Sequence, residues 1–247
     1  MASAHVVRWL GFVDFIDNMT SHPLVTTGYP FPPDFAVAEY EAIHQRVSAK
    51  SKPNMGAWEQ YTGAWNGLAH RFRTCAESDE AFTASIRQAG DAPPPSERYI
   101  QERELFSFFV AGLSSVESLC FALFAIGAML RPNDFPMGTP KELRAISPES
   151  TARTFGSLYP GDAFTSALQQ LTRSQEFRDW KEIRNILAHR AAPGRIIFAG
   201  ITSNQQAAQW KVGISLDLNT TSSRRQWLSG QLTAVLRAVV SYIALEF

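Results

Sequence analysis

The sequence of 247 residues lacks several features that usually indicate a class of chemistry. Its two cysteines, Cys75 and Cys120, are too few for a disulfide framework, and their spacing does not suit a shared metal ion. There is no glycine-rich phosphate loop, no G-x-S-x-G motif, and no Cys-x-x-Cys or His-x-x-x-His pair. The five histidines are scattered singly. We therefore expect no metal and no cofactor, and the scarcity of cysteine predicts a reducing, cytoplasmic compartment.

Net charge is also absent, because the 23 basic and 23 acidic side chains balance. This balance excludes binding to nucleic acid or membrane through bulk charge alone. The charges are nevertheless distributed unevenly along the chain. Residues 1–140 hold 10 basic and 15 acidic side chains, whereas residues 184–247 hold seven basic and two acidic ones. We therefore expect any anion-binding site to be local and to lie in the last quarter of the sequence.

The start of the sequence lacks the basic residues of a signal peptide, so none is predicted. One apolar stretch, residues 105–130, contains a single charged residue, Glu117. It is long enough to span a bilayer, but Glu117 and three serines lie at its middle, where a lipid-facing helix tolerates polar groups least. We therefore predict a buried central helix and no membrane association. A membrane-associated protein is the distant alternative.

Apolar periodicity, proline and glycine divide most of the chain into helices. A helical run over residues 34–49 follows a proline-rich segment, and the helix-rich stretch 162–189 is interrupted near Ser174. Ser96 is a suitable N-cap for the long apolar helix, and residues 221–223 for the last one. Four long helices, enough for a four-helix bundle, are predicted over residues 56–76, 96–130, 174–192 and 223–246.

One segment has the periodicity of a strand. Apolar and polar side chains alternate over residues 210–218, and residues 195–202 are placed to pair with them. A β-hairpin is therefore predicted over about residues 195–218, before the last helix. The predicted fold is mainly α, with an N-terminal helical extension over residues 1–55 and a helical bundle over residues 56–247.

Arg184, Asn185 and His189 lie near the end of a predicted helix that precedes Pro193. An ideal helix turns by about 100° per residue, so Asn185 and His189 are about 40° apart on its surface. The C-terminal end of a helix favours the charged imidazolium. An arginine can hold a phosphate through two hydrogen bonds, and a histidine can exchange protons with the reacting groups. Because RNA supplies its own 2′-hydroxyl nucleophile, this set of residues is suited to metal-free cleavage of a phosphodiester. The alternative from spacing alone is a surface arginine and a histidine that satisfies the carbonyl groups at the end of the helix.

The spacing of Arg184 and His189, with a polar residue after the arginine, resembles the R-x(4–6)-H signature of the HEPN superfamily. Residues 108–119, with their single glutamate, are similar to the central helix of that family, and the resemblance covers about residues 56–247. It implies a helical bundle that dimerises and brings two motifs into one cleft. Many members are metal-independent RNA endonucleases in toxin–antitoxin, phage-defence or CRISPR systems. Toxin members with a tyrosine two places after the histidine have no counterpart here, since Ala191 occupies that position.

This resemblance implies a homodimeric endoribonuclease in which Arg184 binds the scissile phosphate and His189 acts as acid and base. Asn185 has a supporting role, and Arg190 and Arg195 are auxiliary contacts to the substrate. The expected products carry 2′,3′-cyclic phosphate and 5′-hydroxyl ends. The expected partners are RNA, a second copy of the chain, and an antitoxin or defence-system protein. The alternative is a non-catalytic scaffold of HEPN type that binds a nucleotide, RNA or a partner protein.

Three other features have competing interpretations. A buried Glu117 needs a partner, either the motif arginine or a neighbouring helix, and a structural role is favoured. Residues 65–71 are similar to residues 184–190, but a tryptophan replaces the arginine, so His70 is interpreted as structural. The two arginines at positions 224–225 stand in the first turn of the last predicted helix, where basic charge is unfavourable. That position indicates a ligand or an acidic partner.

Overall fold

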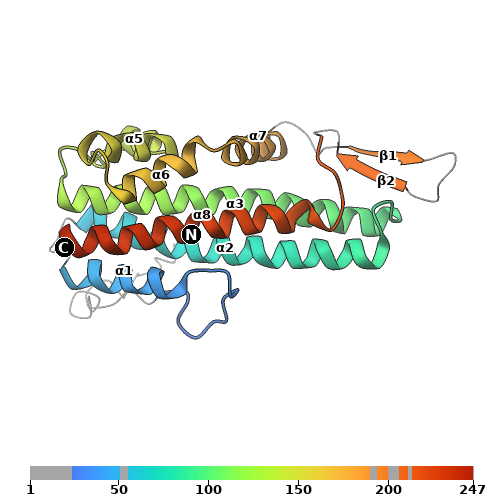
Figure 1. Ribbon diagram of the computed structural model, residues 1–247, viewed down its shortest axis with the longest axis horizontal. Coiled ribbons are helices and arrows are strands. Elements are labelled where there is room, and N and C mark those ends of the chain that lie inside the picture. Colours follow the sequence, from blue (N-terminus) through green and yellow to red (C-terminus); the bar gives the residue numbers. More distant parts are fainter. Residues whose placement is uncertain (1–23, 51–54, 190–193, 200–205, 211–212, 247) are drawn as a thin grey trace, which may run out of the picture.

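The computed structural model describes residues 24–50, 55–189, 194–199, 206–210 and 213–246. Over these residues the chain is mainly helical, as predicted, and the elements form an elongated bundle with a small sheet at one end (Figure 1). The elements are α1 (Val37–Lys50), α2 (Met55–Ala89), α3 (Pro95–Leu130), α4 (Pro140–Ala145), α5 (Pro148–Leu158), α6 (Ala163–Arg173), α7 (Gln175–His189), β1 (Arg195–Ala199), β2 (Gln206–Trp210) and α8 (Asn219–Glu246).

Helices α2 and α3 form a long antiparallel pair, and α5, α7 and α8 pack against it (Figure 1). The prediction that α2 ends near residue 76 is wrong, because the helix continues to Ala89. Phe82 and Ile86 continue its apolar face and are buried. The helix stops at Gly90, whose φ of 72° lies in the left-handed region that glycine adopts without strain.

Helix α3 is the central helix of the bundle. It begins at Pro95, since proline at the first helical position loses no hydrogen bond, and the predicted cap Ser96 therefore lies inside the helix. The most apolar window of α3 is 78% buried, which confirms the prediction of a buried central helix. In the described part of the chain, α3 and α8 are the two helices long and apolar enough to cross a membrane, and the α8 window is 39% buried.

Helices α5, α6 and α7 cover one side of α3, while α1 lies on the other side of the bundle, next to α8 (Figure 1). The predicted interruption near Ser174 is confirmed: Ser174 Oγ accepts a hydrogen bond from the N–H of Phe177 at 3.1 Å, which starts α7. Trp180 then anchors α7 on α3. Its Nε1 donates to the carbonyl oxygen of Phe109 at 2.9 Å, and its ring occupies the space that a Cβ at Gly112 would need.

The two strands pair antiparallel, with Arg195 opposite Trp210. The predicted hairpin is confirmed, but its second strand ends at Trp210, where the strand over residues 210–218 was predicted to begin. The alternation there has another origin. Trp210, Ile214 and Leu216 are buried, and Ser215 forms an isolated bridge with Gln209 of β2.

Helix α8 begins at Asn219, before the predicted cap over residues 221–223. The reason is Asp217: its carboxylate accepts from the N–H of Asn219 at 2.7 Å, and its own N–H donates to Thr220 Oγ1 at 2.8 Å. Helix α1, which belongs to the predicted N-terminal extension, shares one apolar core with the bundle. Residues 1–23 of that extension lie outside the described residues.

Candidate functional site

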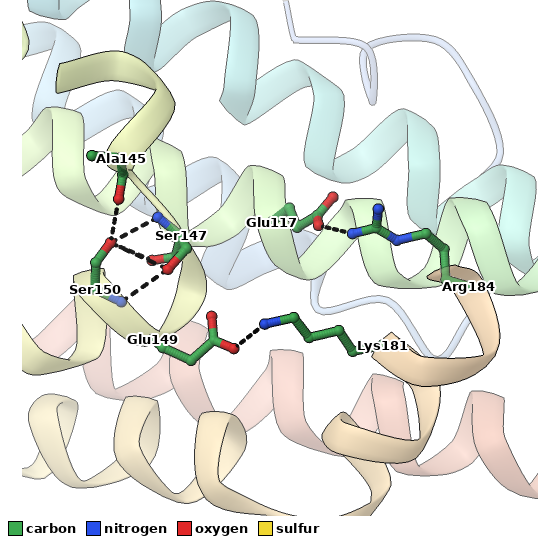
Figure 2. Close-up of polar contacts among 7 residues, drawn as sticks. All are labelled: Glu117, Ala145, Ser147, Glu149, Ser150, Lys181 and Arg184. Carbon is green, nitrogen blue, oxygen red and sulfur yellow. Dashed lines mark hydrogen bonds and ion pairs between the residues drawn. The ribbon is translucent and has the colours of Figure 1, made fainter. Parts of the chain in front are cut away.

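The motif arginine projects from α7 toward the middle of α3. Figure 2 shows Arg184 pointing at Glu117, and its Nη2 forms an ion pair with Glu117 Oε1. The pair lies at the edge of the bundle, since the side chain of Arg184 is 20% exposed and that of Glu117 is 40% exposed. Of the two partners that the sequence left open for Glu117, the structure selects the motif arginine.

One turn before Arg184, Lys181 forms a second ion pair that supports α7. Its Nζ lies 2.5 Å from Oε1 of Glu149, in the first turn of α5 (Figure 2). Burial is the largest single influence on Glu149 and raises its pKa, but the hydrogen bonds from Lys181, Ser147 and the backbone and the charge of Lys181 together outweigh burial, so the pKa lies below its usual value. Ser147 and Ser150 form the capping box that begins α5. Helix α7 is thus tied to α3 and to α5, and Arg184 extends from a supported helix.

The guanidinium of Arg184 is only partly used. Its Nη2 meets Glu117, whereas its Nε is buried without a hydrogen-bond partner among the described residues. A guanidinium carries five N–H donors in a planar fork, and a carboxylate or phosphate can accept two of them at once. The one contact through Nη2 therefore leaves part of this donor capacity unused, although the unpartnered Nε is itself buried.

The structure places the rest of the motif by its main chain. His189 is the last residue of α7, and Asn185, next to Arg184, is partly exposed. His189 follows Arg184 by five positions of the helix, a rise of about 7.5 Å. The imidazole of His189 and the whole of Arg190 lie outside the described part of the chain.

Arg195 occupies a different environment from the one predicted for a substrate contact. Its side chain is 1% exposed, and its Nη1 donates to the carbonyl oxygen of Asp91 at 2.7 Å and to Gln101 Oε1 at 3.0 Å. Burial lowers its pKa. Gln101 precedes Glu117 by sixteen residues of α3, which corresponds to about 24 Å. Arg195 therefore fastens the hairpin to the start of α3, and the structure does not bring it to Arg184.

A groove between α2 and α3 adjoins the Arg184–Glu117 pair, and sequence reasoning missed it. It has a volume of about 340 Å³ and is lined by residues that include Glu59, Gln60, Gly63, Arg71, Glu117 and Phe121. Arg71 crosses from α2 to α3, where its Nη1 donates to Ser118 Oγ and, at 3.5 Å, to the carbonyl oxygen of Ser114. The sequence shows little sign of this groove. Its two walls come from α2 and α3, and they meet only because these two helices pack against each other.

His70 lies beside Arg71 in the sequence but faces another hollow. That hollow, of about 410 Å³, is also lined by Tyr29, Arg73 and Glu77. Trp65, which replaces the arginine in the motif-like segment 65–71, is fully buried in the core. The segment therefore does not form a second arginine–histidine site.

Comparison with protein-family models, with curated proteins and with solved structures found no match. Among the described residues, no group of three or more histidine, cysteine, aspartate or glutamate side chains is arranged to hold a metal ion.

Proposed function

We propose that the chain is an RNA endonuclease of HEPN type, with Arg184 and His189 as its catalytic residues. The observation that supports this most is the partly used guanidinium of Arg184, at the edge of the bundle and five residues before a histidine that ends the same helix. An arginine in such a place can bind phosphate, and the end of α7 favours the proton-donating form of histidine.

In the proposed reaction, Arg184 binds the scissile phosphate and stabilises the charge that develops on its oxygens. The 2′-oxygen of the RNA forms a bond to phosphorus, and the bond from phosphorus to the 5′-oxygen breaks. His189 takes the proton of the 2′-hydroxyl or gives a proton to the 5′-oxygen. The products are a 2′,3′-cyclic phosphate and a 5′-hydroxyl. Asn185 supports the imidazole, and Arg190 adds a phosphate contact.

A second copy of the chain completes the site in this proposal. Proton removal and proton donation occur in the same step, and two His189 side chains from a symmetric dimer would supply one group each. The protein would act in the cytoplasm, and an antitoxin or defence-system protein would restrain it. Glu117 would hold Arg184 in position until the phosphate of the substrate displaces it.

The test is cleavage of RNA in the presence of EDTA, with the product ends identified by their susceptibility to phosphatase and kinase. Arg184→Ala and His189→Ala are each expected to lower the rate by at least about 100-fold, the usual contribution of such groups. Arg237→Ala is the matched control, because Arg237 is 70% exposed and its ion pair with Glu39 lies on α8 and α1. No cleavage by the wild type, or equal rates for all three variants, would refute the endonuclease.

A non-catalytic scaffold is the second candidate, and the ion pair itself favours it. Arg184 already has a carboxylate partner, as an arginine with a purely structural or binding role would. The scaffold predicts that the wild type binds RNA without cleaving it and is expressed at high yield without toxicity. Arg184→Ala would then weaken binding and leave no cleavage to lose.

A further inference from the structure

The groove between α2 and α3 shares one of its walls with the proposed phosphate site. Glu117 lines the groove and is also the partner of Arg184. A ligand whose phosphate reaches Arg184 would therefore extend directly into the groove. We propose that this groove binds one unpaired nucleotide of the RNA, adjacent to the phosphate held by Arg184. This inference rests on the proposed function and adds a recognition site to it.

The dimensions of the groove suit a single nucleotide. Its volume of about 340 Å³ lies at the lower end of small-molecule sites, which begin at about 300 Å³. The guanidinium of Arg71 lies over Gly67, since its Nη1 is 3.3 Å from the position of a Cβ there. Gln60 precedes Gly67 by two helical turns, or about 10 Å along α2. A duplex does not fit into this space, whereas one extended nucleotide does.

The charges of the groove differ between its two ends. Arg71 supplies a guanidinium at one end, next to the carboxylate of Glu117, which is paired with Arg184. Glu59 and Gln60 supply carboxylate and amide groups at the other end. A nucleotide has the complementary arrangement, with an anionic phosphate at one end and hydrogen-bond donors on its base at the other. Carboxylates accept hydrogen bonds from exocyclic amino groups of bases, so Glu59 favours adenine, cytosine or guanine over uracil.

The wall between these ends is suited to the face of a base. Phe121 is partly exposed on α3 and lines the groove opposite Gly63 and Ala64 on α2. A base can stack on an aromatic ring only when it is unpaired, and such stacking is typical of single-strand recognition. The groove therefore selects a single-stranded segment.

Glycine offers a test that leaves the core untouched. A Cβ at Gly63 would meet nothing within 4 Å, so Gly63→Trp places an indole in the groove without a clash at the Cβ position. Gly230 of α8 is the matched control, since a Cβ there also meets nothing within 4 Å. Both changes replace a helical glycine, so their effects on helix stability are the same in kind. Thermal unfolding by circular dichroism checks that both variants fold.

The measurement is the affinity for fluorescein-labelled 2′-O-methyl oligonucleotides, which lack the nucleophile and cannot be cleaved, followed by fluorescence anisotropy. Gly63→Trp and Arg71→Gln are expected to weaken binding at least tenfold, and Gly230→Trp to leave it unchanged. Adenine, cytosine and guanine oligomers are expected to bind more tightly than the uracil oligomer. Glu59→Gln should reduce that preference.

The outcomes separate this inference from the endonuclease. Tight binding that Gly63→Trp and Arg71→Gln abolish supports the groove even when the wild type does not cleave RNA. RNA cleavage with a KM that neither variant changes refutes nucleotide binding in the groove and remains consistent with the proposed endonuclease. Absence of binding to every oligonucleotide, or equal affinity in Gly63→Trp and Gly230→Trp, also refutes the groove.

Discussion

Two arginines, Arg225 and Arg184, reach across the bundle and are treated differently by the fold. Arg225 of α8 donates to Asp34 through two nitrogens, at 2.8 and 3.0 Å, and its Nη1 lies 3.2 Å from carboxylate oxygens of both Asp79 and Glu80. Arg184 of α7 has one carboxylate partner, reached through one nitrogen. The acidic partner that the position of Arg225 indicated is therefore found within the chain itself.

The difference separates a cation that holds the fold together from one that retains donors for a ligand. Burial is the largest single influence on Arg225 and lowers its pKa, but the hydrogen bonds to Asp34, Asp79 and Glu80 and the charge of Asp34 together outweigh burial and raise the pKa. That site joins the segment before α1 to α2 and α8. Around Arg184 the structure provides one carboxylate acceptor, so the guanidinium keeps unused donors, the kind of group that binds a phosphate through two hydrogen bonds. Three measurements test this distinction.

The largest effect is expected from Arg225→Ala. The change leaves the buried carboxylate of Asp79 and that of Asp34 without their cation, so the free energy of unfolding should fall by about 3 kcal/mol. Urea denaturation followed by circular dichroism measures the loss. A loss below about 1 kcal/mol, typical of an exposed ion pair, would show that Arg225 does not hold the fold together.

The next effect concerns the contact that brings Arg184 to α3. Gly112→Ala places a Cβ in the space of the Trp180 ring, and relieving the overlap should reduce the free energy of unfolding by roughly 2–3 kcal/mol. Gly230→Ala, where the added Cβ meets nothing, should instead raise it by about 0.5–1 kcal/mol. Thermal unfolding of the two variants compares them directly. Equal stability would mean that Trp180 does not fix α7 on α3.

The smallest effect on stability is expected from Arg184→Ala. The Arg184–Glu117 pair is partly exposed and uses one nitrogen, so its loss should lower the free energy of unfolding by no more than about 1 kcal/mol. The exposed Arg237 gives the baseline, with about 0.3 kcal/mol expected for Arg237→Ala. Urea denaturation of both variants is the measurement. A loss as large as that of Arg225→Ala would make Arg184 a structural cation and remove the support for the proposed site.

The sequence predicted α3 almost to the residue, because a long apolar run between prolines is typical of one buried helix of a bundle. It failed for α2 beyond residue 76, where Glu77, Asp79 and Glu80 have the composition of an exposed loop. Asp79 and Glu80 form ion pairs with Arg225, which is far away in the sequence. These ion pairs compensate the acidic charge and allow the helix to continue there. The failure shows how a tertiary contact overrides local composition.

Spacing along one helix predicted that Asn185 and His189 share a face, whereas Arg184 lies about 140° from His189 and reaches the same edge only through its long side chain. The partner of Arg184 could not be predicted from spacing, since the crossing of α7 over α3 depends on how Trp180 meets Gly112. The role of Arg195 was equally hidden, because its burial depends on where the hairpin docks. Sequence thus identified the candidate residues, and packing decided which of them lie together.

The ion pair between Arg184 and Glu117 has a consequence for how binding would respond to salt. A free arginine that neutralises a phosphate allows a condensed counterion to leave, and affinity then falls steeply with ionic strength. Arg184 is already neutralised by Glu117, so a phosphate that reaches it exchanges one anion for another and changes the local charge little. An affinity built on such an exchange varies less with salt than the number of arginine contacts alone would suggest.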